Sequence, residues 1–169
     1  MAVSEAVISI GPAQLGSWFD AHASRLVLYA RQWVPAATAE DLVQDIFLRL
    51  AAQPRAPDNV HAWLLTSTRH AALDALKTSR RRGPRDAAAG EARAFERQPA
   101  DTLNPAEVEA MLAQLSPLQR EVITLKIWND ATFQEIAAIT STPLSTVYAH
   151  YKSGLTQLKR RLETPCRKT

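Results

Sequence analysis

The stretch FQEIAAITSTPLSTVYAHYKSGLTQLKRRL, residues 133–162, decides the fold of this chain. Its apolar residues recur at helical spacing on both sides of a short polar interruption, Thr140-Ser141-Thr142. This pattern predicts a short helix, a brief turn and a longer helix that opens at Pro143, because proline is favoured in the first turn of a helix. Two helices joined by so short a turn form a helix-turn-helix.

The longer helix has two distinct faces. An apolar face is expected to pack on the preceding helices and contains Val147, Tyr151, Leu155, Leu158 and Leu162. The opposite face presents Ser145, Tyr148, Ala149, Lys152, Thr156 and Lys159. Short polar groups followed by cations suit a helix whose N-terminus enters the DNA major groove while its flank meets phosphates. The alternative is a helical hairpin that serves only to dock a protein.

Helix caps precede this unit along the chain. Capping-box spacing, in which a short polar residue is followed three positions later by Glu or Gln, occurs at Asn104, Ser116 and Thr132. The boxes predict helices at residues 105–114, 117–128 and 133–139, followed by a last long helix at 143–162. Before them, residues 83–104 have few large apolar side chains and contain two glycines and two prolines. This segment is expected to be a flexible linker between residues 1–82 and 105–169.

The first half also follows a helical pattern. The first helix has a stripe of Leu15, Trp18, Phe19, His22, Leu26, Tyr29, Ala30 and Trp33, and it stops at Pro35. A second helix at 39–52 buries Leu42, Val43, Ile46, Phe47 and Leu50. A third, capped by Asp58 or Asn59, continues to about Arg82. Because no alternating β pattern of any length occurs, we predict an all-α protein of two small helical domains, the C-terminal one a helix-turn-helix.

Two polar surfaces of the first half are candidate binding sites. In the second helix, Asp41, Gln44, Asp45 and Leu48 form a stripe beside the buried face. The stripe suits a basic partner helix, and a solvated acidic face is the alternative. In the third helix Arg69, His70, Asp74 and Lys77 precede the run Arg80-Arg81-Arg82. A basic helix of this kind can hold single-stranded DNA, and a solvated face with a cationic C-terminus is equally open.

The charge of the chain is concentrated in two blocks. Residues 54–82 and 132–169 each carry six basic and two acidic side chains, net +4, whereas the other two segments are net acidic. Two separate basic blocks indicate two contacts with one polyanion, although basic helix ends give the same pattern.

Composition excludes several other classes. A single cysteine, Cys166, excludes an internal disulfide framework, and four scattered histidines make a zinc site unexpected. Since no apolar run is long enough for a membrane span and the N-terminus does not resemble a signal peptide, a soluble, cytoplasmic protein is expected.

Four stretches, taken in order, resemble a bacterial RNA polymerase sigma factor of the extracytoplasmic-function (ECF) group. They are AEDLVQDIFLRL (39–50), AWLLTSTRHAALDALK (62–77) with the arginine run, LSPLQREVITLKIWNDATFQEIAAI (115–139) and TVYAHYKSGLTQLKRRL (146–162). The resemblance covers about residues 12–82 and 105–162. It implies sigma region 2 at residues 1–82, a linker at 83–104 that threads toward the polymerase active-site channel, and region 4 at 105–169.

The resemblance also implies roles for the candidate residues. Asp41, Gln44, Asp45 and Leu48 would bind the clamp helices of the polymerase β′ subunit. Arg69, His70, Asp74, Lys77, Arg80 and Arg81 would melt and recognise the −10 promoter element. Ser145, Thr146, Tyr148, Ala149, His150 and Lys152 would recognise the −35 element, and this domain would touch the β flap. Further implications are an anti-sigma partner, no cofactor or metal, no membrane insertion and no catalysis.

The sequence is also compatible with a different class of function. The chain could be a stand-alone helix-turn-helix regulator whose N-terminal helices bind a protein. The acidic stripe together with the basic third helix favours the sigma factor.

Three departures from the family pattern bear on DNA recognition. His70 replaces the usual Asn after Arg69, which puts the usual −10 base preference in question. Thr140-Ser141-Thr142 replaces Leu-Gly-Ile, so that either Ser141 adopts a strained left-handed conformation or the turn differs. Tyr148-Ala149-His150 replaces Lys-Ser-Arg, which implies an unusual −35 sequence or weak binding.

Overall fold

The computed structural model describes residues 10–82 and 105–163. Within these ranges the chain is helical and contains no strand, which confirms the all-α prediction. The chain divides into two compact units, one on each side of the segment 83–104. The expected linker and the cap expected at Asn104 lie outside the described residues.

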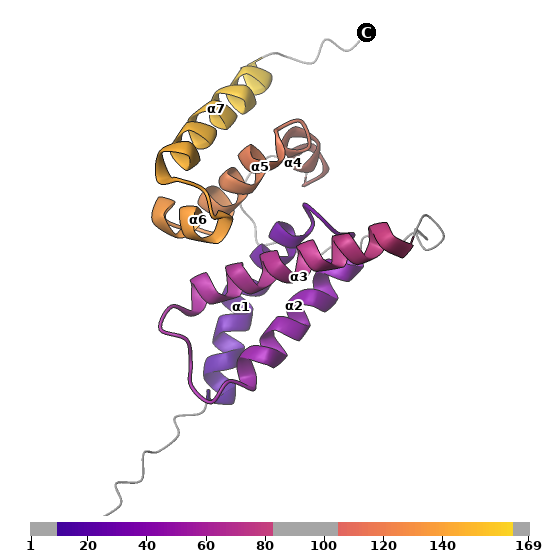
Figure 1. Cartoon of the computed structure of the whole chain (residues 1–169), viewed down its shortest axis with the longest axis vertical. Coiled ribbons are helices and arrows are strands. Elements are labelled where there is room, and N and C mark those ends of the chain that lie inside the picture. Colours follow the sequence, from indigo (N-terminus) through magenta and orange to yellow (C-terminus); the bar gives the residue numbers. More distant parts are fainter. Residues whose placement is uncertain (1–9, 83–104, 164–169) are drawn as a thin grey trace, which may run out of the picture. The chain divides into compact units, whose positions relative to one another are not determined.

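The first unit is a bundle of three helices, α1 (Pro12–Ala30), α2 (Ala36–Ala51) and α3 (Val60–Arg82), each in contact with the other two (Figure 1). Its core consists of fully buried side chains from all three helices. They are Leu26 and Tyr29 of α1, Val43, Ile46 and Leu50 of α2, and Leu64 and Leu65 of α3. Phe19, which belongs to the apolar stripe of the first helix, is 38% exposed, and its ring lies edge-on to Phe47 with centroids 5.0 Å apart.

Two helix starts in this unit have clear local causes. Pro35 is the N-cap of α2, so that this helix begins at Ala36, three residues before the expected start. At α3, the Asn59 side chain accepts a 2.9 Å hydrogen bond from the Ala62 backbone N–H. The cap is therefore Asn59 rather than Asp58, and it satisfies one of the N–H groups that a helix start leaves free.

The second unit contains α4 (Pro105–Leu112), α5 (Pro117–Ile123), the π-helical turn η2 (Thr124–Trp128), α6 (Phe133–Thr140) and α7 (Leu144–Glu163). Complete capping boxes open α5, between Ser116 and Gln119, and α6, between Thr132 and Glu135, as expected. Arg120 donates to the Leu112 and Ala113 carbonyls at 2.8 and 3.0 Å and so closes the end of α4. The helix expected at 117–128 is correct in extent, but its last turn is π-helical.

The turn between α6 and α7 resolves the question raised by the missing glycine. Ser141 adopts φ 51° and ψ 41°, the left-handed conformation. Its backbone N–H donates to the Ala138 carbonyl and that of Thr142 to the Ala137 carbonyl, which caps α6. A non-glycine residue here costs about 1–2 kcal/mol, and the geometry of the helix-turn-helix holds it in place.

The buried face of α7 is narrower and shorter than expected. Val147, Gly154 and Leu158 are buried, and Tyr151 and Leu155 are half-buried. Leu162, predicted to be on the buried face, is 58% exposed, and that prediction is wrong. Residues 159–163 are all exposed, because the last turn of α7 extends beyond the helices on which it packs.

Candidate protein-docking and nucleic-acid surfaces

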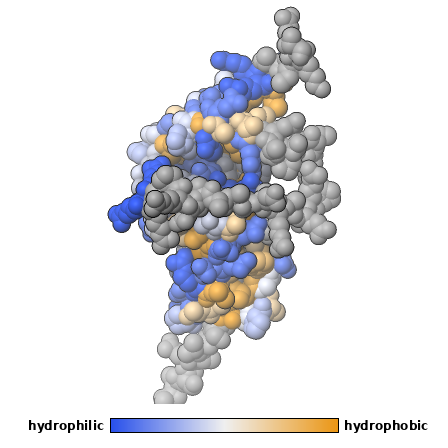
Figure 2. All heavy atoms as spheres, turned by 90° about the vertical axis from the view of Figure 1, so that its right-hand side faces the viewer, coloured by the Kyte–Doolittle hydropathy of each residue, from blue (hydrophilic) through white to orange (hydrophobic). Residues whose placement is uncertain are grey.

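The stripe on α2 lies on the solvent side of the helix. Asp41, Gln44, Asp45 and Leu48 are all exposed, whereas Val43 and Ile46 between them are buried. Leu48 is 68% exposed, the largest exposure among the large apolar side chains of the described residues. Figure 2 shows that apolar side chains reach the surface of the first unit among hydrophilic ones. An exposed leucine with two carboxylates on the preceding turns gives this face both an apolar anchor and a negative charge.

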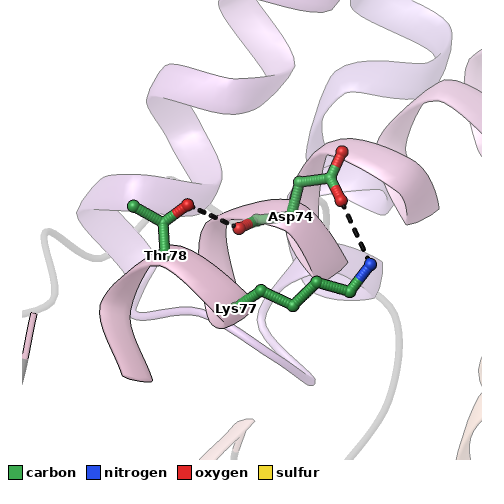
Figure 3. A network of polar contacts seen from close by, with 3 residues as sticks. All are labelled: Asp74, Lys77 and Thr78. Carbon is green, nitrogen blue, oxygen red and sulfur yellow. Dashed lines mark hydrogen bonds and ion pairs between the residues drawn. The ribbon is translucent and has the colours of Figure 1, made fainter. Parts of the chain in front are cut away.

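The polar side chains of α3 lie near its C-terminal half. His70, Asp74, Lys77, Arg80 and Arg81 are exposed, and Arg69 is half-buried. Asp74 and Lys77 pair with each other, with Oδ1 and Nζ 3.4 Å apart, while the Thr78 hydroxyl donates to the Asp74 carbonyl at 2.9 Å (Figure 3). Both members of this ion pair are largely exposed, so the pair is weak.

The candidate DNA-contacting residues of α7 divide into two groups. Ser145, Tyr148, Ala149 and Lys152 are exposed on one face, as are Thr156 and Lys159 further along it. Thr146 and His150 are half-buried and lie toward the packed side. The C-terminal end of α7 is hydrophilic (Figure 2) and carries Lys159, Arg160 and Arg161, with Lys159 3.7 Å from Glu163.

An aromatic cluster around Phe133 was not expected from the sequence. The Phe133 ring, at the start of α6, lies edge-on to Tyr148 and Tyr151, with centroids 5.6 and 5.2 Å apart. The Lys126 ammonium lies 4.9 Å from the Phe133 centroid, and that of Lys152 lies 5.7 Å from the Tyr148 centroid. Spacing along the chain gave no signal for this cluster, because its members come from three elements that only the fold brings together.

A pair of histidines joins α1 to α3 in the first unit. The rings of His22 and His61 stack with centroids 5.2 Å apart and an interplanar angle of 27°. Burial, the neighbouring His61 and then Arg25 lower the pKa of His22 below its ordinary value of 6.5. The described residues contain no cluster of three or more His, Cys, Asp or Glu side chains, so the pair has no third ligand for a metal ion.

This pair predicts that the first unit loses stability in acid. As the pH falls below about 6.5, the unfolded chain protonates His22 before the folded chain does, so proton uptake favours unfolding. Thermal unfolding followed between about pH 7.5 and pH 5 measures the slope of stability against pH. His22→Gln is expected to flatten it. An equal slope in wild type and His22→Gln contradicts this assignment.

Two families match the two units in turn. Residues 18–82 match the family described as Sigma-70 region 2, and residues 106–158 match Sigma-70, region 4. The ECF RNA polymerase sigma factor RpoE of Cereibacter sphaeroides is 26% identical over 137 residues, covering 75% of this chain and 74% of that protein. No helix in the described part of the chain is both long and apolar enough to cross a membrane.

Two solved structures have a similar fold. One is the sigma factor RpoE in complex with the anti-sigma factor NepR from Bartonella quintana, with a TM-score of 0.69 and 23% identity over 89% of this chain and 97% of that one. The other is CnrH in complex with the cytosolic domain of CnrY, with a TM-score of 0.59 and 21% identity over 90% of each chain.

Proposed function

This chain belongs to the sigma-70 family as an ECF sigma factor with regions 2 and 4, and on that premise we propose which of its surfaces carry each step of transcription initiation. An alternative sigma factor binds core RNA polymerase and directs it to specific promoters. The domain assignment that we propose is region 2 at residues 1–82, a linker at 83–104 and region 4 at 105–169. The matches at 18–82 and 106–158 support it.

The exposed stripe on α2 is the proposed contact with the polymerase β′ clamp helices. The observation that carries this assignment is the side chain of Leu48, which is 68% exposed beside Asp41, Gln44 and Asp45. Burial of an exposed leucine against a partner lowers the free energy of the complex, and the nearby carboxylates favour a basic partner.

The C-terminal half of α3 is the proposed −10 surface. Arg80 and Arg81 are exposed cations for the phosphates, and His70 and Asp74 lie one turn apart as polar groups for base edges. Arg69 and Lys77 complete the proposed set.

The exposed face of α7 is the proposed −35 surface. Ser145, Tyr148, Ala149 and Lys152 point to solvent from the first half of the helix. In a helix-turn-helix, the N-terminal part of the second helix lies in the major groove of DNA. Thr146 and His150 belong to the proposed set as half-buried flanking residues, and contact of region 4 with the β flap is part of the same proposal.

The remaining proposals concern partners and location. The similar RpoE structure contains the anti-sigma factor NepR, which supports an anti-sigma protein as a partner of this chain. A sigma factor acts where the polymerase is, so we place the protein in the cytoplasm. The family implies a non-enzymatic role.

Transcription in vitro with purified core polymerase over a random promoter library tests the function directly. We expect run-off products from a subset of templates. These templates should share two sequence elements, one near −10 and one near −35 relative to the transcription start. Co-purification with core polymerase separates this function from that of a stand-alone regulator, which would bind DNA without the polymerase. DNA binding in the absence of any affinity for the core enzyme would favour the regulator.

We expect His70→Asn to change the preferred base within the −10 element and to leave the −35 preference unchanged. A neutral imidazole offers one donor and one acceptor, whereas an amide offers two donors and an acceptor. A good base contact discriminates by about 1–3 kcal/mol, which a promoter library resolves. Because His70 is exposed, the melting temperature should stay the same. A lower melting temperature with an unchanged base preference would show that His70 is structural.

Lys152→Ala is expected to weaken binding about equally for all −35 sequences. Loss of one phosphate contact lowers the slope of log affinity against log salt by about one unit. Binding of promoter duplexes to the holoenzyme over a range of salt concentrations measures this slope. Lys152→Arg retains the charge and should keep it. A changed base preference at an unchanged salt slope would be incompatible with a phosphate contact.

A further inference from the structure

We propose that Tyr148 recognises the methyl group of a thymine in the −35 element, and that Phe133 is the residue that positions its ring. This inference rests on the proposed insertion of α7 into the −35 major groove and names the base feature that this part of the helix recognises.

The Tyr148 ring is both exposed and held. It is 51% exposed on the first half of α7, where a helix-turn-helix meets base edges. Its other side lies against Phe133, with centroids 5.6 Å apart and an angle of 81°, a favourable edge-to-face arrangement. An aromatic ring that is already held in place loses little conformational entropy when it binds.

Phe133 is itself fixed by two further contacts. Its ring lies edge-on to Tyr151 at 5.2 Å, and the Lys126 ammonium lies 4.9 Å from its centroid. Phe133 is also the first residue of α6, directly after the complete capping box of Thr132 and Glu135. The position of the Tyr148 ring is therefore set by the start of α6 as well as by α7.

The exposed neighbours of Tyr148 limit what it can recognise. Ala149 is exposed beside it, and the Lys152 ammonium lies 5.7 Å from its centroid, one turn further on. Specific recognition of guanine normally uses a bidentate Arg or Lys. The first half of α7 contains no arginine, and its one lysine, Lys152, is the proposed phosphate contact. The apolar feature of the major groove is the thymine methyl group, which matches an aromatic ring next to an alanine methyl.

The test uses the full chain assembled with core polymerase and the −35 element that this holoenzyme selects from a random library. Each thymine of that element is replaced in turn by deoxyuridine, which removes only the methyl group. We expect one position at which the replacement weakens binding about fourfold, the effect of one buried methyl. Tyr148→Ala should abolish this dependence on the methyl group there, and Tyr148→Phe should keep it.

Two further variants separate recognition from folding. Tyr148→Arg should shift the preference at that position to guanine, a gain that an unfolded variant cannot produce. Phe133→Leu, which keeps an apolar side chain but removes the ring edge, should lower the dependence on the methyl group at that position. A purely structural role of Phe133 would weaken binding to all templates alike.

Three results would overturn the proposal. One is a selected element with no position that depends on a thymine methyl group, and another is a Tyr148→Ala variant that keeps the dependence. The third is a holoenzyme that selects −10 sequences but no −35 sequence, which would also remove the proposed role of α7. Selection of a −35 element without any dependence on the methyl group refutes only the inference about Tyr148.

Discussion

Asp45→Arg is expected to lower the affinity of the protein for core RNA polymerase about 100-fold or more and to abolish promoter-directed transcription. Asp45 is exposed on α2, between the buried residues Val43 and Phe47. The substitution places a cation against a partner surface that the carboxylates of α2 indicate to be basic. Arg forms helices about as well as any charged residue, so α2 should keep its structure.

Matched variants show whether the effect belongs to the docking surface. Asp20→Arg makes the same change of charge at an exposed position of α1 outside the stripe, and it should leave the affinity for the core enzyme unchanged. Leu48→Ala should lower that affinity about tenfold through lost apolar burial alone, without loss of stability, because Leu48 is 68% exposed in the free protein. Equal affinities for wild type and Asp45→Arg, with both folded by circular dichroism, would refute the assignment of this surface.

Short-range sequence patterns were sufficient to predict most helix boundaries. Ser116 with Gln119 and Thr132 with Glu135 form the complete boxes that their spacing predicted, because a capping box is closed by residues only three apart. The left-handed conformation of Ser141 was one of two outcomes expected from the absence of glycine. On α2 the alternation of buried and exposed positions follows directly from helical periodicity.

Tertiary contacts account for what the sequence did not predict. The π-helical turn at 124–128 ends where the buried Asn129 side chain donates to the Thr124 carbonyl at 3.2 Å, and no periodic pattern indicates such a bond. Leu162 has the right spacing for the buried face of α7 but lies beyond the helices on which α7 packs. The contact between Phe133 and Tyr148 depends on the angle between α6 and α7, which the turn sets.

Gly154→Leu is expected to have the largest effect on stability and to lower the free energy of unfolding of the second unit by about 3 kcal/mol. Gly154 is buried in α7, and a Cβ atom at this position would lie 2.5 Å from Ile123 Cδ1 and 3.6 Å from Gln119 Cβ. Ile123 is itself fully buried, so it has little room to move. Helical periodicity alone did not single out this glycine, whose small size lets α7 approach α5.

The same reasoning predicts opposite signs for alanine at two glycines. In α1, a Cβ at Gly16 would meet nothing within 4 Å, so Gly16→Ala should stabilise the first unit by about 0.5–1 kcal/mol through helix propensity.

Gly154→Ala gains the same propensity but must displace Ile123, and overpacking of this kind costs about 1–3 kcal/mol, so it should destabilise the second unit. Hydrogen exchange of the full chain, followed separately over α1 and over α5 and α7, measures both effects in one protein. An increase in hydrogen-exchange protection of α7 in Gly154→Ala would contradict this prediction. It would mean that Ile123 moves freely and that the close packing of α7 on α5 does not depend on the glycine. If protection falls as expected, Gly154→Leu should also lose −35 binding while retaining the proposed contact of α2 with core polymerase, because only the second unit is disturbed.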